Sequence, residues 1–137
     1  MPFGVGVLFQ QRASTKRLWP DYWANTCCSH PRWGESVELA VTRRLQEEMG
    51  ISTDLDYVYK FEYSARYLDL GSEHEVCHVY IGQTKVDPTH NPTEVAAWRW
   101  MPAAALTKEL AENPDQYTPW LHLEWSRLNA QFRDLLP

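Results

Sequence analysis

One stretch decides the fold: residues 23–50, WANTCCSHPRWGESVELAVTRRLQEEMG. Its first residues, Trp23–Cys28, predict a short strand in which Cys27 and Cys28 face opposite ways, because side chains alternate along a strand. Ser36 is a typical helix N-cap, and Gly50 is a typical C-terminal stop. The helix between them carries an apolar stripe that predicts packing on a sheet, at Val37, Ala40, Val41, Leu45 and Met49.

The flanking sequence predicts further strands and helices in a mixed order. Strands are expected over residues 4–11, 56–66, 74–84 and 95–101, and helices over residues 102–112 and 120–135. This order predicts an α+β protein, an α/β/α sandwich with a mixed sheet. Because we find no repeats or linkers, one domain is expected over residues 1–137.

The composition is that of a soluble globular chain, with 44% hydrophobic and 23% charged residues. A net charge of −5 argues against non-specific binding of nucleic acid. No apolar run reaches membrane-spanning length, so no membrane contact is expected. Three cysteines without a disulfide framework favour a reducing compartment, and we expect a cytoplasmic protein.

Charged residues on the helix allow two interpretations. Glu47 and Glu48, with Glu35 just before the helix, have the oxygen ligands that Mg²⁺ prefers. The alternative is a solvated face, since Arg44 and Glu48 have the spacing of a helical ion pair. Charge spacing alone favours the solvated face.

A second carboxylate pair lies in the segment Glu73-His74-Glu75. On a strand, Glu73 and Glu75 share a face and His74 points away. The pair is suited to holding a metal with a nitrogen from His30, and a metal would tune the carboxylates for acid–base work. Glutamates at a hairpin edge are more often simply exposed.

Cys28 is the most specific single candidate for a catalytic residue. A cysteine on a strand is usually a buried structural residue. Beside a histidine, basic side chains and a metal, its thiolate becomes a proton carrier or a nucleophile. We find no Gly-x-Ser-x-Gly elbow and no Walker-type loop, which disfavours acyl transfer and ATP-style phosphoryl transfer.

These motifs together resemble the type 1 isopentenyl-diphosphate isomerases, relatives of the Nudix hydrolases. The resemblance covers the thiol motif NTCCSHP, a degenerate Nudix box that ends at Gly50, the segment EHEVCHV and the late TPW. Ser29 replaces the glycine that begins the box. Arg44 stands where Nudix hydrolases have a glutamate, which favours the isomerase branch.

The resemblance implies roles for individual residues. Cys28 and Glu75 would transfer protons on opposite faces of an alkene, Trp120 would lie near the cationic carbon, and Tyr63 would contact Glu75. Three cations would hold the diphosphate: Arg12, Lys16 and Arg44. Glu48 and the Cys28 carbonyl would hold Mg²⁺, and a second site, for Mn²⁺ or Zn²⁺, would consist of His30, Glu73 and Glu75.

The function implied is the interconversion of isopentenyl diphosphate and dimethylallyl diphosphate, by a monomer or weak dimer that binds only this small substrate. Members of the family begin with a further segment that supplies two histidines to the second metal site, so the resemblance predicts an N-terminally truncated Nudix-like domain. Two alternatives follow: a catalytically impaired protein that binds isoprenoid diphosphates or metal, and a Nudix-type diphosphate hydrolase. The hydrolase alternative requires Glu47 and Glu48 for catalysis and leaves Cys28 dispensable.

Overall fold

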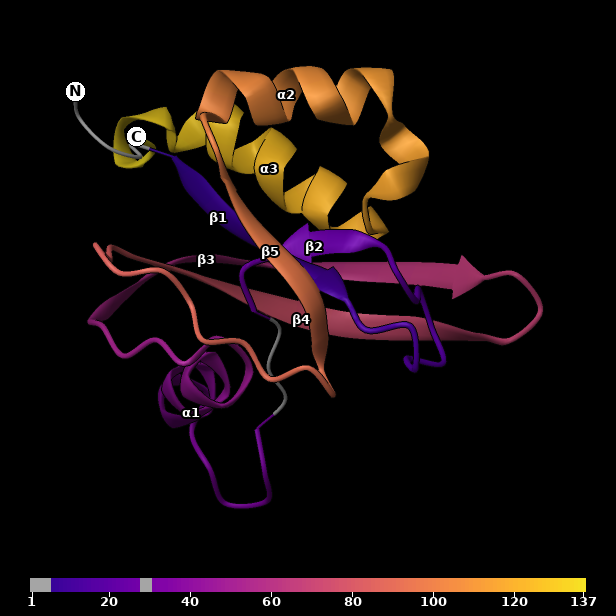
Figure 1. The fold of residues 1–137 in the computed structure, drawn as a ribbon, viewed down its shortest axis with the longest axis horizontal. Coiled ribbons are helices and arrows are strands. Elements are labelled where there is room, and N and C mark those ends of the chain that lie inside the picture. The colour runs from indigo at the N-terminus through magenta and orange to yellow at the C-terminus, as the bar shows by residue number, and fades with distance from the viewer. Residues whose placement is uncertain (1–5, 28–30) are drawn as a thin grey trace.

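A computed structural model describes residues 6–27 and 31–137 and contains two antiparallel sheets (Figure 1). The first sheet has the order β2-β1-β5, formed by Trp23–Asn25, Val7–Arg12 and Val95–Met101. Phe9 is the register partner of Asn25 on one side and of Arg99 on the other. β1 is therefore the central strand, and both of its faces are covered.

The second sheet is the hairpin of β3, Leu55–Tyr67, and β4, Gly71–Gly82. The ladder runs from the pair Leu55 and Gly82 to the pair Tyr67 and Gly71, with an irregularity between Tyr57 and Tyr59. Both strands are longer than the sequence predicts. Gly71 and Ser72, which were expected in the turn, instead pair with Tyr67 and Arg66.

Helix α1, Val37–Met49, begins and ends where the sequence predicts. The Ser36 hydroxyl accepts a hydrogen bond from the Leu39 N–H at 3.2 Å. Gly50 has a φ of 65°, and a Cβ there would lie 2.7 Å from the Thr89 carbonyl oxygen. Glycine is thus required at the C-cap by both backbone conformation and space.

Helices α2, Ala103–Glu112, and α3, Pro119–Gln131, are joined by a 3-10 turn at Pro114–Gln116. Their side chains also meet, since the Trp125 indole N–H donates to the Thr107 hydroxyl at 2.9 Å. The last helix ends earlier than predicted, and a 3-10 turn follows at Arg133–Leu135. Phe132, between them, stacks on Tyr59 with 5.2 Å between ring centroids.

The helices form two layers on either side of the strands (Figure 1). Leu8, on one face of β1, packs with Leu45 and Met49 of α1. Phe9, on the opposite face, packs with Leu106 of α2 and Leu121 of α3. This arrangement is the predicted α/β/α sandwich.

The pairing of the strands differs from the predicted mixed sheet. Every ladder among the described residues is antiparallel, and the parallel pairing found there is an isolated bridge between Trp23 and Tyr117. The consecutive strands β1 and β2, and β3 and β4, pair as neighbours through short connections, which can only give antiparallel ladders. None of the described helices has the length and apolar character needed to cross a bilayer.

The strand predicted over Trp23–Cys28 is shorter in the structure and ends at Asn25. Side-chain amides bind the two carbonyls that follow β2: Gln10 donates to the Thr26 carbonyl at 2.7 Å, and Asn25 donates to the Cys27 carbonyl at 2.8 Å. Local side-chain bonds of this kind compete with strand pairing. The argument from strand alternation therefore does not apply at Cys27.

Candidate active site

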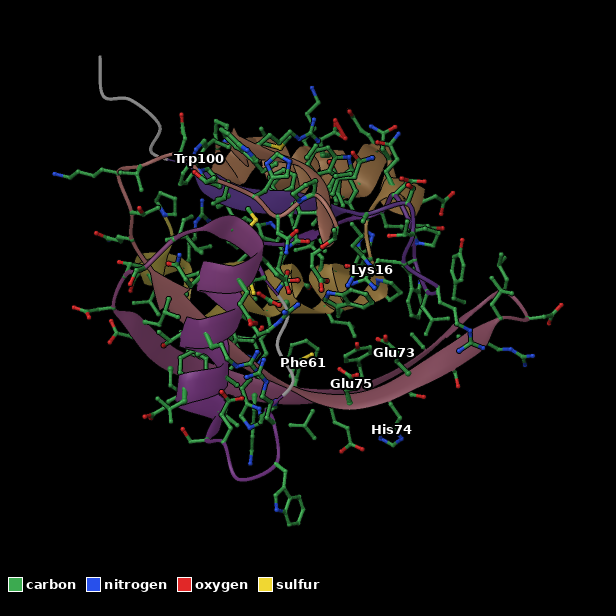
Figure 2. The ribbon with its side chains drawn as sticks, turned by 60° about the horizontal axis from the view of Figure 1, so that its bottom comes forward. Lys16, Phe61, Glu73, His74, Glu75 and Trp100 are labelled. Carbon is green, nitrogen blue, oxygen red and sulfur yellow. The ribbon has the colours of Figure 1, made fainter. Side chains whose placement is uncertain are left out.

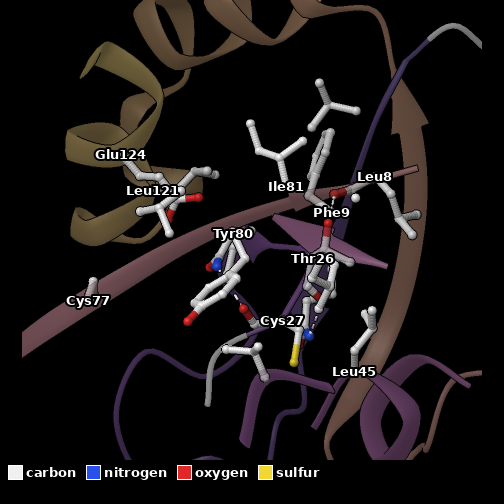
Figure 3. Close-up of a pocket in the computed structure, with 18 of the residues that line it drawn as sticks. Leu8, Phe9, Thr26, Cys27, Leu45, Cys77, Tyr80, Ile81, Leu121 and Glu124 are labelled. Carbon is white, nitrogen blue, oxygen red and sulfur yellow. Dashed lines mark hydrogen bonds between the residues drawn. The ribbon is translucent and has the colours of Figure 1, made fainter. Parts of the chain in front are cut away.

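One cavity of about 1330 Å³ lies between β1, α1, β4 and α3 (Figure 3). Its lining includes both polar residues from the sequence motifs and apolar residues of the two core layers. Every predicted site residue that the structure describes contributes to it: Arg12, Lys16, Arg44, Glu48, Tyr63, Glu73, Glu75 and Trp120. Segments far apart in the sequence thus meet at one site.

Arg44 of α1 is the centre of an ion-pair network in this cavity. Its guanidinium donates to Glu47 at 3.0 Å and to Glu48 at 2.5 Å. Glu94, in the loop before β5, lies 3.5 Å from Arg44 and forms an ion pair with Lys16. Two of the predicted diphosphate-binding cations are therefore linked through one carboxylate.

Glu48 is buried, with 6% of its surface exposed. Its two carboxylate oxygens accept hydrogen bonds from Gln10, at 2.8 Å, and from Arg44. Burial raises the pKa of Glu48, and the bonds from Gln10 and Arg44 oppose that shift. The interpretation as a solvated face is thus wrong for Glu48, although Glu47 is exposed.

Glu35 has a different environment from Glu48. Its carboxylate forms a bidentate ion pair with Arg43, at 2.8 and 2.9 Å, and accepts the Arg32 backbone N–H at 2.9 Å. The bond from Arg43 lowers the pKa of Glu35 to about 2. This pairing fixes the loop before α1 onto the helix, so both oxygens of Glu35 are already engaged.

On β4, Glu73 and Glu75 share the face that looks into the molecule, and His74 points the other way (Figure 2). The Tyr63 hydroxyl donates to Glu73 at 2.8 Å, and Tyr63 is the cross-strand register partner of Glu75. Tyr63 thus bonds one of the two carboxylates directly and lies opposite the residue that carries the other in the ladder. His74 forms an ion pair with Glu62 on the outer face of the hairpin.

Trp120 lies at the start of α3 and is buried. Its ring lies 5.9 Å from the Tyr63 ring, and its indole N–H donates to the Asn25 side chain at 3.1 Å. The Arg12 guanidinium lies over the indole, 5.1 Å from the ring centroid. An aromatic face, a tyrosine hydroxyl with its carboxylate partner and a cation therefore occupy one region of the cavity.

Cys28 and His30 lie outside the described residues. The neighbouring Cys27 packs with the apolar cluster of α1, beside Leu45 (Figure 3). Within residues 6–27 and 31–137, no group of three or more His, Cys, Asp or Glu side chains is placed to hold a metal ion. Of the ligands predicted for the second metal site, the described part of the chain contains only Glu73 and Glu75.

The magnesium site fits the described residues better. Glu48 is a buried carboxylate among cations, and Mg²⁺ bound with a diphosphate needs only one or two protein carboxylates. Glu94, within the same network, supplies a second carboxylate.

Two polar residues of this site were not predicted. Glu94 lies in a polar loop without any motif, so the sequence carried no signal for it. The sequence did carry a signal for Gln10. It lies two residues after Leu8 on an apolar strand, so both side chains face the same way, and a glutamine buried there needs a hydrogen-bond partner.

Comparisons with known proteins identify relatives of this chain. The model of the NUDIX domain family matches residues 3–121. The isopentenyl-diphosphate Delta-isomerase 1 of Photorhabdus laumondii subsp. laumondii is 43% identical over 132 residues, which are 95% of this chain and 75% of that protein. The isopentenyl-diphosphate Delta-isomerase of Nocardia farcinica is 45% identical over 129 residues, 93% of this chain and 74% of that protein.

Solved structures show the same fold. A MutT protein from Methanosarcina mazei Go1 superimposes with a TM-score of 0.71 and 18% identity, over 93% of this chain and 85% of that chain. A MutT NUDIX hydrolase from Burkholderia pseudomallei gives a TM-score of 0.67 and 20% identity, over 93% of this chain and 91% of that chain.

Proposed function

This chain belongs to the NUDIX family and, within it, to the isopentenyl-diphosphate Delta-isomerases, and we propose that it interconverts isopentenyl diphosphate and dimethylallyl diphosphate. The reaction moves a carbon–carbon double bond by one position. A proton is added to one carbon and another proton is removed from a second carbon, so the charge and the atoms balance without a redox step.

The observation that supports this most is the convergence on one cavity of two chemically different groups of side chains. Arg12, Lys16 and Arg44 supply positive charge for a diphosphate, although the whole chain is acidic. Trp120 and Tyr63 supply a largely apolar surface for a small hydrocarbon tail. An isoprenoid diphosphate has these two ends.

At the charged end, Glu48 would hold a divalent cation, which would neutralise part of the negative charge of the diphosphate. Arg44 already holds one oxygen of Glu48 and also contacts Glu94, so the carboxylate is oriented before substrate binds. Fixing the diphosphate uses remote binding energy to position the reacting carbons.

At the hydrocarbon end, Glu75 and Cys28 exchange the two protons in our proposal. Protonation of an alkene creates a tertiary cation, and an indole face stabilises such a charge by about 2 kcal/mol when water is excluded. The Trp120 ring is held in place by its indole N–H, which donates to the Asn25 side chain at 3.1 Å. Tyr63, bonded to Glu73, orders the carboxylate face beside the ring.

The test is proton exchange with solvent. Isopentenyl diphosphate incubated with the protein and Mg²⁺ in D₂O is expected to gain deuterium and to form dimethylallyl diphosphate, without release of phosphate or pyrophosphate. Cys28→Ala and Glu75→Gln should abolish the exchange. Cys27→Ala, which removes a thiol from the apolar cluster beside α1, is the matched control and should retain it.

Two results would refute the proposal. Release of phosphate or pyrophosphate, with no isomer formed, would identify a Nudix-type hydrolase. Binding of the diphosphate without deuterium exchange would identify a binding protein. Supplementing the assay with Mn²⁺ or Zn²⁺ measures whether the second metal of the family changes the rate of exchange.

A further inference from the structure

Gln10 is a buried polar residue in an apolar layer. Only 4% of its surface is exposed. It lies on the same side of β1 as Leu8, which faces α1 and packs among the apolar residues of that layer. Burying an amide without partners costs free energy comparable to that of a lost hydrogen bond, so the position is unfavourable unless its bonds are made.

Both amide N–H donors of Gln10 have an acceptor. Nε2 lies 2.7 Å from the Thr26 carbonyl oxygen and 2.8 Å from Oε1 of Glu48. Both partners are oxygens that accept, so the amide must present its nitrogen to them. The orientation of the side chain is therefore fixed by its surroundings.

These two bonds join segments that the proposed chemistry needs together. Thr26 precedes Cys28 by two residues, and Glu48 is the carboxylate that would hold the divalent cation. Arg44 holds the second oxygen of Glu48 at 2.5 Å. Gln10 thus holds the Glu48 carboxylate and the backbone at Thr26 together.

We propose that Gln10 is a positioning residue for the metal–diphosphate site, which sets the geometry of the Glu48 carboxylate and ties it to the backbone at Thr26. The inference rests on the proposed function for the role of Glu48. Partners that orient a metal ligand typically contribute 10- to 100-fold to metal affinity.

The test replaces Gln10 with Met, which keeps the length of the side chain and removes both donors. Gln11→Met is the matched control: it makes the same change one residue further along β1, where the amide is half-buried on the opposite face and donates to the Asp21 carbonyl at 3.0 Å. Calorimetry with Mg²⁺ and inorganic pyrophosphate measures binding without catalysis, and thermal unfolding checks that both variants are folded.

We expect Gln10→Met to weaken Mg²⁺-dependent pyrophosphate binding by about tenfold or more. It should also raise the Mg²⁺ concentration required for half-maximal isomerisation, and Gln11→Met should change neither. In a Glu48→Gln background, Gln10→Met should have little further effect on binding, because the contact it disrupts is already altered. Gln10→Leu, which also lacks the donors and adds no charge beside Glu48, is the second variant if the methionine protein does not fold.

A folded Gln10 variant with wild-type Mg²⁺ dependence overturns the inference, as does an effect that is equally large in the Glu48→Gln background. A wild-type protein that does not bind pyrophosphate with Mg²⁺ overturns it as well. Loss of Mg²⁺-dependent binding in Gln10→Met, in a protein that nevertheless does not isomerise its substrate, supports the inference and refutes the proposed function.

Discussion

Glu124 provides a sensitive test of the electrostatics of the cavity. It lies on α3, one helical turn after Trp120, and faces the cavity opposite Cys77 of β4 (Figure 3). Burial raises the pKa of Glu124 from 4.5 to about 7. Its ionised form is therefore disfavoured in the folded chain, and Glu124→Gln removes that cost.

The size of the effect follows from linkage. A shift from 4.5 to about 7 is worth roughly 3 kcal/mol at 1.36 kcal/mol per pH unit. Part of the residue surface is exposed to the cavity, which reduces the penalty, so we expect about 2 kcal/mol.

The sign also follows from the raised pKa. Below pH 4.5 the carboxyl is protonated in both the folded and the unfolded chain, and the substitution removes no charge. Between pH 4.5 and about 7 the folded chain retains the proton more strongly, so wild-type stability falls relative to the variant as pH rises. Above that range the difference is constant.

The assay is urea unfolding, followed by tryptophan fluorescence at several pH values from about 4 to about 8, for wild type and Glu124→Gln. Glu112→Gln, at an exposed glutamate of α2, controls for the loss of one negative charge. A stability difference between wild type and Glu124→Gln that does not change with pH would refute the reasoning, because it would mean that Glu124 titrates alike in both states.

Three further predictions follow from particular contacts. Glu35→Gln should lower stability above pH 4.5, where the wild-type carboxylate is ionised and bound to Arg43, and the difference in urea unfolding should shrink as pH falls towards 2; a constant difference would contradict this. Gly50→Ala should cost about 2 kcal/mol, since alanine must adopt a φ of 65° against the Thr89 carbonyl, and an unchanged denaturation midpoint would count against it. Trp120→Leu should lower kcat about 30-fold while pyrophosphate binding persists, and turnover at the wild-type rate would exclude the indole from cation stabilisation.

The sequence predicted those parts of the fold that depend on local signals. Ser36 and Gly50 bound the first helix because capping is a property of single residues, and the strand predicted over residues 95–101 has its observed bounds, Val95–Met101. The end of β2 could not be predicted, because it depends in part on the Gln10 amide, which reaches the Thr26 carbonyl only once β1 and β2 lie side by side.

The site residues divide in the same way. Motifs indicated Arg44, Glu48 and Trp120, all of which line the cavity. Glu94 escaped prediction because its partners, Lys16 and Arg44, come together only through tertiary packing. The roles of the predicted residues, the monomer or weak dimer, the single domain and the cytoplasmic location remain predictions.

The side chain of Arg12 connects the two ends of the cavity. Its guanidinium donates to the carbonyls of Trp19 at 3.1 Å and Leu18 at 3.0 Å while lying over the Trp120 ring. The loop between β1 and β2 is thus attached to the Trp120 ring through one guanidinium. A ligand that draws Arg12 away from the indole would also release the Leu18 and Trp19 carbonyls, so occupation of the cavity and the conformation of this loop would be coupled.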